Sequence, residues 1–238
     1  MRNATGIAVA EPATDPIYRL LAWLSPSYPI GAFSYSHGIE TAVEEGFIKD
    51  RPTLVRWLES VLLHGTGAVD GALFAAAWQA ATDHDWPAFD AIAERAAAWR
   101  GTSEMALESR QQGGSFLAMT RVAWPHPALE ETHQRLAGEI SLPVAVALAA
   151  AAHDIALARA LDGYLHAFVA NLISAAVRSV PLGQSDGQIA LASLERAVRK
   201  AASAALAVRS LDDVGTCTPL LDWCSMRHET QYTRLFRS

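Results

Sequence analysis

The segment from Leu161 to Ala176 sets the strongest constraint on the fold. Apolar residues recur in it at spacings of three and four over several turns, which is the pattern of a helix with one face in a core. Pro181 follows and cannot continue that helix. Alternating apolar and polar runs bounded by turns, which are typical of strands, are almost absent. We therefore expect an all-α protein, a single-domain bundle of about eight to ten helices.

Other segments support a helical fold. Leu54, Leu58 and Leu62 mark one face of a helix that begins near Pro52. The run from Phe89 to Ala96 marks another. Ser185 and Gln188 have the S-x-x-Q spacing of a capping box, so we expect a helix to begin there and to continue to about Val208.

Composition limits the class of protein. Of 238 residues, 51% are hydrophobic, enough to bury a core from about residue 16 onward, with residues 1–15 as a flexible N-terminal tail. The net charge of −6 argues against a nucleic-acid partner. The segment from Leu142 to Leu161 carries charged residues and is expected to be a core helix, and no apolar run is pure enough to span a membrane. Two cysteines imply no disulfide framework and fit a cytoplasmic protein.

No motif in the sequence indicates catalysis. A phosphate-binding loop and a nucleophile elbow are both missing, and paired acids such as Glu44–Glu45 are adjacent and cannot share a helix face. Cys217, Cys224 and His228 lie close enough in sequence to hold a soft or borderline metal. No C-x-x-C pair or fourth ligand accompanies them, so we favour a semi-buried cysteine and a hydrogen-bonding histidine, with no catalytic residue and no stable metal site.

The loop "SPSYPIGAFSYSHGIE", Ser25–Glu40, combines restricted backbone with aromatic rings. Pro26 and Pro29 limit its conformations, and Gly31 can adopt angles that other residues resist. We expect this loop to hold Phe33 and Tyr35 at the surface with little entropy left to lose, which favours partner binding.

The C-terminal sequence "MRHETQYTRLFRS" is unusually apolar for a chain end. Tyr232, Leu235 and Phe236 have the spacing of a helical stripe, and arginines surround them. Exposing such side chains forgoes roughly 1.5–3 kcal/mol each, so something should cover them. Two interpretations stay open: residues 226–238 bind a partner, or they fold back on the core of the chain itself.

The loop, the turn "RSVPLGQSDGQ" (Arg178–Gln188) and the tail together resemble the UreF family of urease accessory proteins. The three motifs occur in order across nearly the whole chain, and "TSEMALESRQQGGSFL" near Thr102 is more loosely similar. The resemblance implies an all-α, non-enzymatic homodimer that binds the accessory protein UreD, called UreH in some organisms. That complex recruits the GTPase UreG and couples its GTP cycle to nickel insertion into apo-urease. Nickel would pass in transit through the assembled complex, with no cofactor held stably.

The resemblance also assigns residues. In the family, the positions of Phe33 and Arg234 belong to segments that become ordered when UreD binds. Arg234 is therefore the strongest single candidate for partner binding, because a guanidinium can donate several hydrogen bonds. His228, Glu229 and Tyr232 would support it. The full partner-binding set is Phe33, Tyr35, His37, Arg227, His228, Glu229, Tyr232, Arg234, Leu235 and Phe236. The loop-shaping set is Pro26, Pro29, Gly31, Gly38, Pro181 and Gly187. Gln184, Ser185, Asp186 and Gln188 would cap a helix or line the route between subunits, and capping is favoured.

Two other functions remain as alternatives. The protein could be a GTPase-activating protein that supplies Arg234 or Arg178 to UreG as an arginine finger. It could also store nickel through Cys224 and His228.

Overall fold

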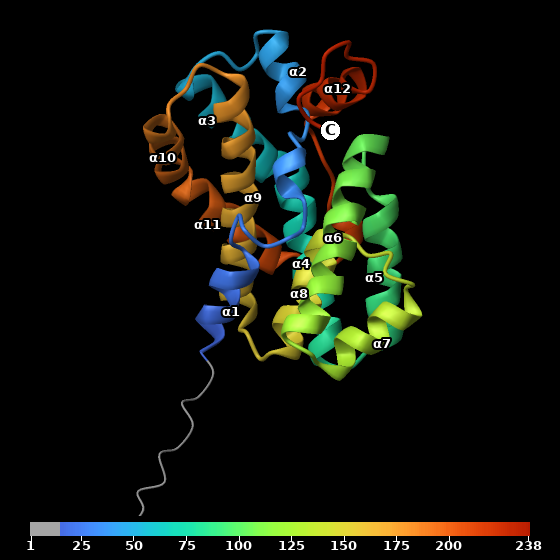
Figure 1. The fold of residues 1–238 in the computed structure, drawn as a ribbon. Coiled ribbons are helices and arrows are strands. Elements are labelled where there is room, and N and C mark those ends of the chain that lie inside the picture. The colour runs from blue at the N-terminus through green and yellow to red at the C-terminus, as the bar shows by residue number, and fades with distance from the viewer. Residues whose placement is uncertain (1–14) are drawn as a thin grey trace, which may run out of the picture.

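The computed structural model describes residues 15–238, so most of the expected N-terminal tail lies outside the described residues (Figure 1). The described part is all-α, as expected, with twelve α-helices, two short 3₁₀ helices and no strand. The α-helices are α1 Pro16–Trp23, α2 Ile39–Glu44, α3 Arg51–His64, α4 Thr66–Thr82, α5 Trp86–Ala98, α6 Ser103–Ala123, α7 Pro127–Arg135, α8 Leu142–Ala152, α9 Leu157–Ser179, α10 Gln184–Ser193, α11 Glu195–Ala207 and α12 Pro219–His228. The 3₁₀ helices are η1 Ala32–Ser34 and η2 Leu211–Asp213.

The core is built around α4 and α8, which pack on each other. Helices α5, α9 and α11 also pack against α4, and α6 packs against α8 (Figure 1). Every residue of α8 from Pro143 to Ala150 is buried, as expected for a helix that is apolar on all sides. Small side chains let its neighbours approach closely. At Gly113 on α6, an added Cβ would lie 2.1 Å from the carbonyl oxygen of Ile140, just before α8.

The helices expected from periodicity are present. Leu54, Leu58 and Leu62 are fully buried on α3, and Pro52 lies in its first turn. Phe89 and Ala96 are buried on α5. The long apolar stripe from Leu161 to Ala176 belongs to α9, and the helix ends two residues before Pro181.

Two expected helices are each divided, which accounts for the larger number of helices. The capping-box prediction at Ser185 was wrong, because α10 begins at Gln184 after Gly183 and Ser185 lies inside it. That helix stops at Ser193, and α11 begins after Leu194 rather than continuing the same axis to Val208. The apolar segment from Leu142 to Leu161 is broken between α8 and α9, where Asp154 adopts a positive φ of 57°.

Two described segments are long and apolar enough to cross a membrane by length and composition alone. They are Arg51–Thr82 and Leu157–Ser179. The protein buries 61% and 50% of their most apolar windows, and the first is interrupted at Gly65 between α3 and α4. Core packing therefore accounts for their apolar character.

Candidate partner-binding site

The loop between α1 and α2 follows a path that glycine makes possible. Gly31 and Gly38 have φ angles of 76° and 77°, the left-handed region that glycine enters at little cost. Gly38 also lies against α12, where an added Cβ would be 3.3 Å from the main-chain nitrogen of Ser225. His37 precedes it with a φ of 55°, an uncommon conformation for a residue other than glycine, and its side chain is buried.

The C-terminal tail, residues 229–238, folds back onto this loop. The main-chain N–H of Arg237 donates to the carbonyl of Ser34 at 2.8 Å, and the N–H of Ser36 donates to the main-chain oxygen of Ser238 at 2.8 Å. Figure 1 places the C-terminus beside α2 and α12, at one end of the molecule. The loop and the tail therefore form one continuous surface. In the isolated chain, the tail folds onto its own core.

A buried carboxylate network anchors the tail. Glu40 of α2 accepts the main-chain N–H groups of Leu235 and Phe236, at 2.6 and 3.0 Å. Its Oε2 also lies 3.0 Å from Nε2 of His228, whose Nδ1 is 2.8 Å from Glu104 of α6. His228 is completely buried, and both of its ring nitrogens face carboxylate oxygens.

Arg234 completes this network from the tail. Its Nη1 donates to Glu104 at 2.7 Å and to the carbonyl of His228 at 3.3 Å. The side chain remains 37% exposed, so one part of the guanidinium is fixed while the rest faces solvent. The structure thus brings Arg234 and His228 together. Glu229 is exposed and accepts a hydrogen bond from Ser103, and Tyr232 is fully exposed.

A second histidine–carboxylate pair lies under the loop. His37 contacts Glu108 through Nδ1 at 3.0 Å and Thr66 through Nε2 at 2.8 Å, and Ser238 donates to the same Glu108 carboxylate at 3.0 Å. Burial would raise the pKa of Glu108, but the charge of His37 and the hydrogen bonds from His37 and Ser238 outweigh it and lower that pKa. Glu108 therefore ties both the loop and the tail to α6.

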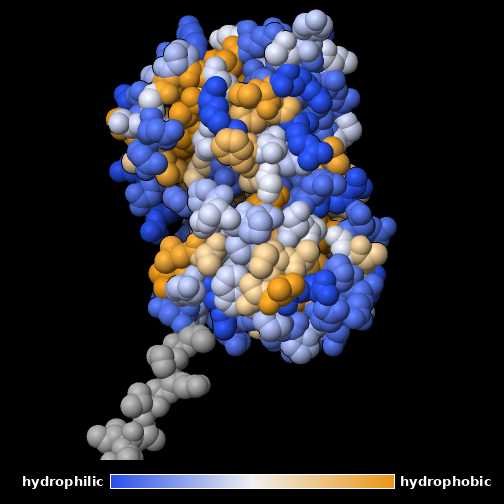
Figure 2. Space-filling view, in the orientation of Figure 1, coloured by the Kyte–Doolittle hydropathy of each residue, from blue (hydrophilic) through white to orange (hydrophobic). Residues whose placement is uncertain are grey.

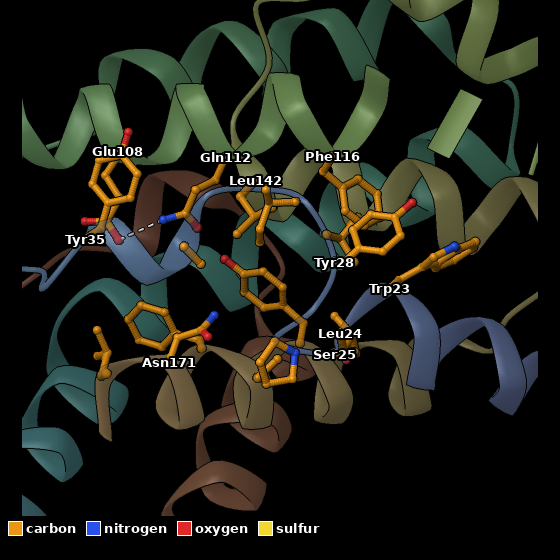
Figure 3. A pocket seen from close by; sticks show the side chains of 18 residues that line it. Trp23, Leu24, Ser25, Tyr28, Tyr35, Glu108, Gln112, Phe116, Leu142 and Asn171 are labelled. Carbon is orange, nitrogen blue, oxygen red and sulfur yellow. Dashed lines mark hydrogen bonds between the residues drawn. The ribbon is translucent and has the colours of Figure 1, made fainter. Parts of the chain in front are cut away.

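Glu108 also borders a partly open pocket of about 40 Å³ between the loop, α6 and α9 (Figure 3). Tyr28, Gln112 and Asn171 contribute polar groups to its wall, and Gln112 donates to Glu108 at 3.2 Å. A smaller cavity of about 20 Å³ adjoins it and shares Glu108 and Gln112. Each has room for at least one water molecule.

Several expected positions are not at the surface. Tyr35 and His37 are each only 4% exposed, so the prediction that the loop presents both Phe33 and Tyr35 to solvent was wrong for Tyr35. Phe33, at 69%, is exposed as expected. The helical stripe expected in the tail is also absent, since residues 229–238 are not helical and bury Phe236 while exposing Leu235.

The remaining expected residues lie on α12 and α10. Arg227 is exposed on α12, with its guanidinium 5.9 Å from the ring of Trp223. Gly187 is not loop-shaping, because it lies inside α10 where a Cβ would be 3.2 Å from Val177 of α9. Gln184 and Gln188 are exposed on the same helix, and Asp186 pairs with Arg51 of α3 at 2.7 Å. None of these side chains forms the expected cap, since Gly183 occupies that position without a side-chain hydrogen bond.

The possible metal ligands near the C-terminus lie in different environments. Cys217 is exposed, whereas Cys224 is buried, and burial raises the pKa of its thiol to about 12. Both nitrogens of His228 already face Glu40 and Glu104. Among residues 15–238, no group of three or more His, Cys, Asp or Glu side chains has a geometry that could hold a metal ion.

Sequence reasoning missed the acidic half of this site. Glu40 is the last residue of the loop motif, and Glu104 and Glu108 lie within "TSEMALESRQQGGSFL". Their i, i+4 spacing on α6 was the available signal, because it places both carboxylates on one helix face. A buried ion pair between Asp70 and Arg100, at 2.8 Å, was also missed and carries no local pattern.

Comparison with known proteins identifies the family. The UreF family model matches residues 48–195, more than half of the chain. The chain belongs to the UreF family. It is 48% identical over 222 residues to the urease accessory protein UreF of Granulibacter bethesdensis, covering 93% of this chain and 94% of that protein. It is 48% identical over 231 residues to the UreF of Rhodopseudomonas palustris strain BisB18, covering 97% and 95%. The UreF of Azorhizobium caulinodans is 45% identical over 233 residues, covering 98% and 100%.

Proposed function

We propose that this chain is a urease accessory protein that acts in the cytoplasm as a non-enzymatic scaffold. It binds UreD (UreH), recruits the GTPase UreG and couples the GTP cycle of UreG to nickel insertion into apo-urease. The names of the UreF relatives support the role in urease maturation. The carrying observation is the joined surface of loop and tail, in which Phe33 and Leu235 are exposed above a buried hydrogen-bond network.

That surface has the physical properties of a docking site. Phe33, Tyr232 and Leu235 are 69%, 102% and 63% exposed, and aromatic and arginine side chains dominate binding hot spots. The main chain beneath them is held by Glu40 and by the hydrogen bonds to Ser34 and Ser36. A pre-ordered surface loses less conformational entropy when it binds, so we assign UreD to this face.

The homodimer is proposed to form through α1. Ile17, Tyr18 and Leu21 are 54%, 68% and 68% exposed on this helix, and a groove lies between it and the start of α9. Figure 2 shows apolar side chains gathered over α1. An apolar face of this kind on a helix is typical of an interaction surface.

Nickel is treated as cargo in this proposal. The two adjoining cavities share Glu108, and His37 and Asp70 line the smaller one. Carboxylate and imidazole groups are ligand types that a divalent cation can use. In the isolated chain Asp70 is paired with the buried Arg100 and His37 with Glu108, so passage requires these pairs to open. No resident metal is part of the proposal.

Co-expression with UreD, followed by affinity purification and sizing, tests the scaffold. We expect the full chain to capture UreD and a chain ending at Arg227 to lose capture, with an Arg209→Ala variant as a surface control. Equal capture by the full and shortened chains would contradict the assignment of UreD to this face.

The same system separates the scaffold from a GTPase-activating protein. Arg234 already donates to Glu104 and to the carbonyl of His228, which favours an architectural role over a free finger. We expect Arg234→Lys to weaken assembly, because both hydrogen bonds come from the terminal Nη1 of a planar guanidinium, and the shorter lysine carries its ammonium in a different place. If the complex assembles fully and only UreG-catalysed GTP hydrolysis is lost, the arginine-finger alternative is correct.

A further inference from the structure

Arg178 lies in the last turn of α9, outside both the loop and the tail, yet it contacts both. Its guanidinium carbon is 3.7 Å from the ring centroid of Phe33 in η1 and 4.4 Å from that of Phe236 in the tail. Cation–π attraction operates at these distances. One side chain therefore contacts rings from the two opposite ends of the sequence.

The orientation of Arg178 is fixed from its own helix. Its Nε donates to the carbonyl of Ser174 at 3.1 Å, one turn earlier on α9. Burial lowers the pKa of the guanidinium, in keeping with its partial enclosure by the rings, although an arginine remains charged at physiological pH. A partly desolvated cation is held more strongly by aromatic faces than one in water.

The position of Arg178 coincides with the main-chain pairing of loop and tail. Phe33 is adjacent to Ser34, whose carbonyl accepts from Arg237, and Phe236 is adjacent to Arg237 itself. Glu40 holds the tail from α2, whereas Arg178 holds it through the side chain of Phe236 from α9. Phe33 otherwise remains 69% exposed, so little else fixes its ring.

We propose that Arg178 is a positioning residue that joins Phe33 of the loop to Phe236 of the tail and so holds the docking surface in one conformation. The part that concerns a partner rests on the proposed function of that surface. Lysine would keep the charge but not the planar group that lies against two rings, and methionine would keep an apolar stem without the charge.

Hydrogen exchange of the full-length isolated chain tests the positioning. The reporters are the amides of Arg237 and Ser36, which pair the tail with the loop. We expect Arg178→Met and Arg178→Lys to lower protection of both amides about tenfold, while amides of α8 keep theirs. Arg196→Met, at an exposed arginine on α11, is the matched control. Unchanged protection in both Arg178 variants would overturn the proposal, and retained α8 protection shows that the variants fold.

A double-mutant cycle separates positioning from a general structural effect. If Arg178 acts through Phe236, Phe236→Leu should lower protection of the Arg237 amide much less in the Arg178→Met background than in the native chain. The conservative change Phe236→Tyr keeps an aromatic face, so it should leave protection of the Arg237 amide near the native value. Additive effects of Arg178→Met and Phe236→Leu would contradict the proposal.

Capture of co-expressed UreD then distinguishes this inference from the proposed function. If the tail loosens and capture of UreD weakens, the result supports both the positioning role of Arg178 and the assignment of UreD to this surface. If the tail loosens and capture is unchanged, Arg178 still positions the tail but the assignment of UreD to this surface is wrong. If protection is native in both Arg178 variants, the inference is wrong whatever the capture.

Discussion

The apolar core around α8 and the polar junction beneath the tail are stabilised in different ways. In α8, buried alanine, valine and leucine side chains pack on all sides without directional demands. In the junction, Glu104 and His228 are buried and Glu40 is half-buried, and each depends on partners from other elements. Apolar packing tolerates exchange of similar side chains, whereas a buried charge that loses its partner keeps its full desolvation cost. The junction is therefore the more fragile of the two regions.

The largest effect should come from His228→Ala. This change leaves the buried Glu104 and the half-buried Glu40 without the imidazole between them. We expect a loss of about 3–5 kcal/mol in the free energy of unfolding, together with release of the tail. Urea unfolding measures the first and hydrogen exchange at the Ser36 amide measures the second.

His64→Ala is the control, because His64 is exposed in the last turn of α3. It should change the free energy of unfolding by no more than about 0.5 kcal/mol. If His228→Ala is equally mild, the junction does not depend on its charges and the comparison with the core fails.

The two regions also differ in how far the sequence predicts them. The buried face of α9 follows from the spacing of residues from Leu161 to Ala176, because a helical period is a local property. The junction unites Glu40, Glu104 and His228 from α2, α6 and α12, and no local rule relates them. The exposure of Tyr35 was mispredicted for the same reason, since its burial depends on where α6 and the tail lie.

An intermediate effect should come from overpacking the core at Gly113. An alanine Cβ there would lie 2.1 Å from the carbonyl oxygen of Ile140, so α6 must move away from the start of α8. We expect Gly113→Ala to destabilise the protein by about 1–3 kcal/mol in urea unfolding, although alanine is the better helix former by about 1 kcal/mol. The amides of Ser36 and Arg237 should keep their protection relative to the amides of α8.

Gly215→Ala is the matched change at an open position, since no atom lies within 4 Å of the added Cβ. It should alter the free energy of unfolding by about 0.5 kcal/mol or less. A stabilised Gly113→Ala protein would show that helix propensity exceeds the packing cost, and that the core approach at α6 is looser than the geometry indicates.

The smallest effect should come from acid acting on Glu108, which ties the loop and the tail to α6, and the tail should loosen before the core. In the unfolded chain Glu108 takes up a proton near its ordinary pKa of 4.5, and in the folded chain His37 and Ser238 lower that pKa. The stability from ionised Glu108 is therefore complete above pH 4.5 and is lost as the pH falls through the lower, folded pKa. As the pH falls below the folded pKa of Glu108, the Ser36 amide should lose protection from hydrogen exchange before the amides of α8.

Glu108→Gln should make stability less dependent on pH in this acid range, because the substituted residue cannot take up a proton. Glu59→Gln, at an exposed position on α3, should leave the pH dependence unchanged. Urea unfolding of the three proteins between about pH 6 and pH 3 measures the difference. If the native and Glu108→Gln curves are parallel, Glu108 has the same proton affinity in the folded and unfolded chain. The tail then does not depend on the ionisation of Glu108.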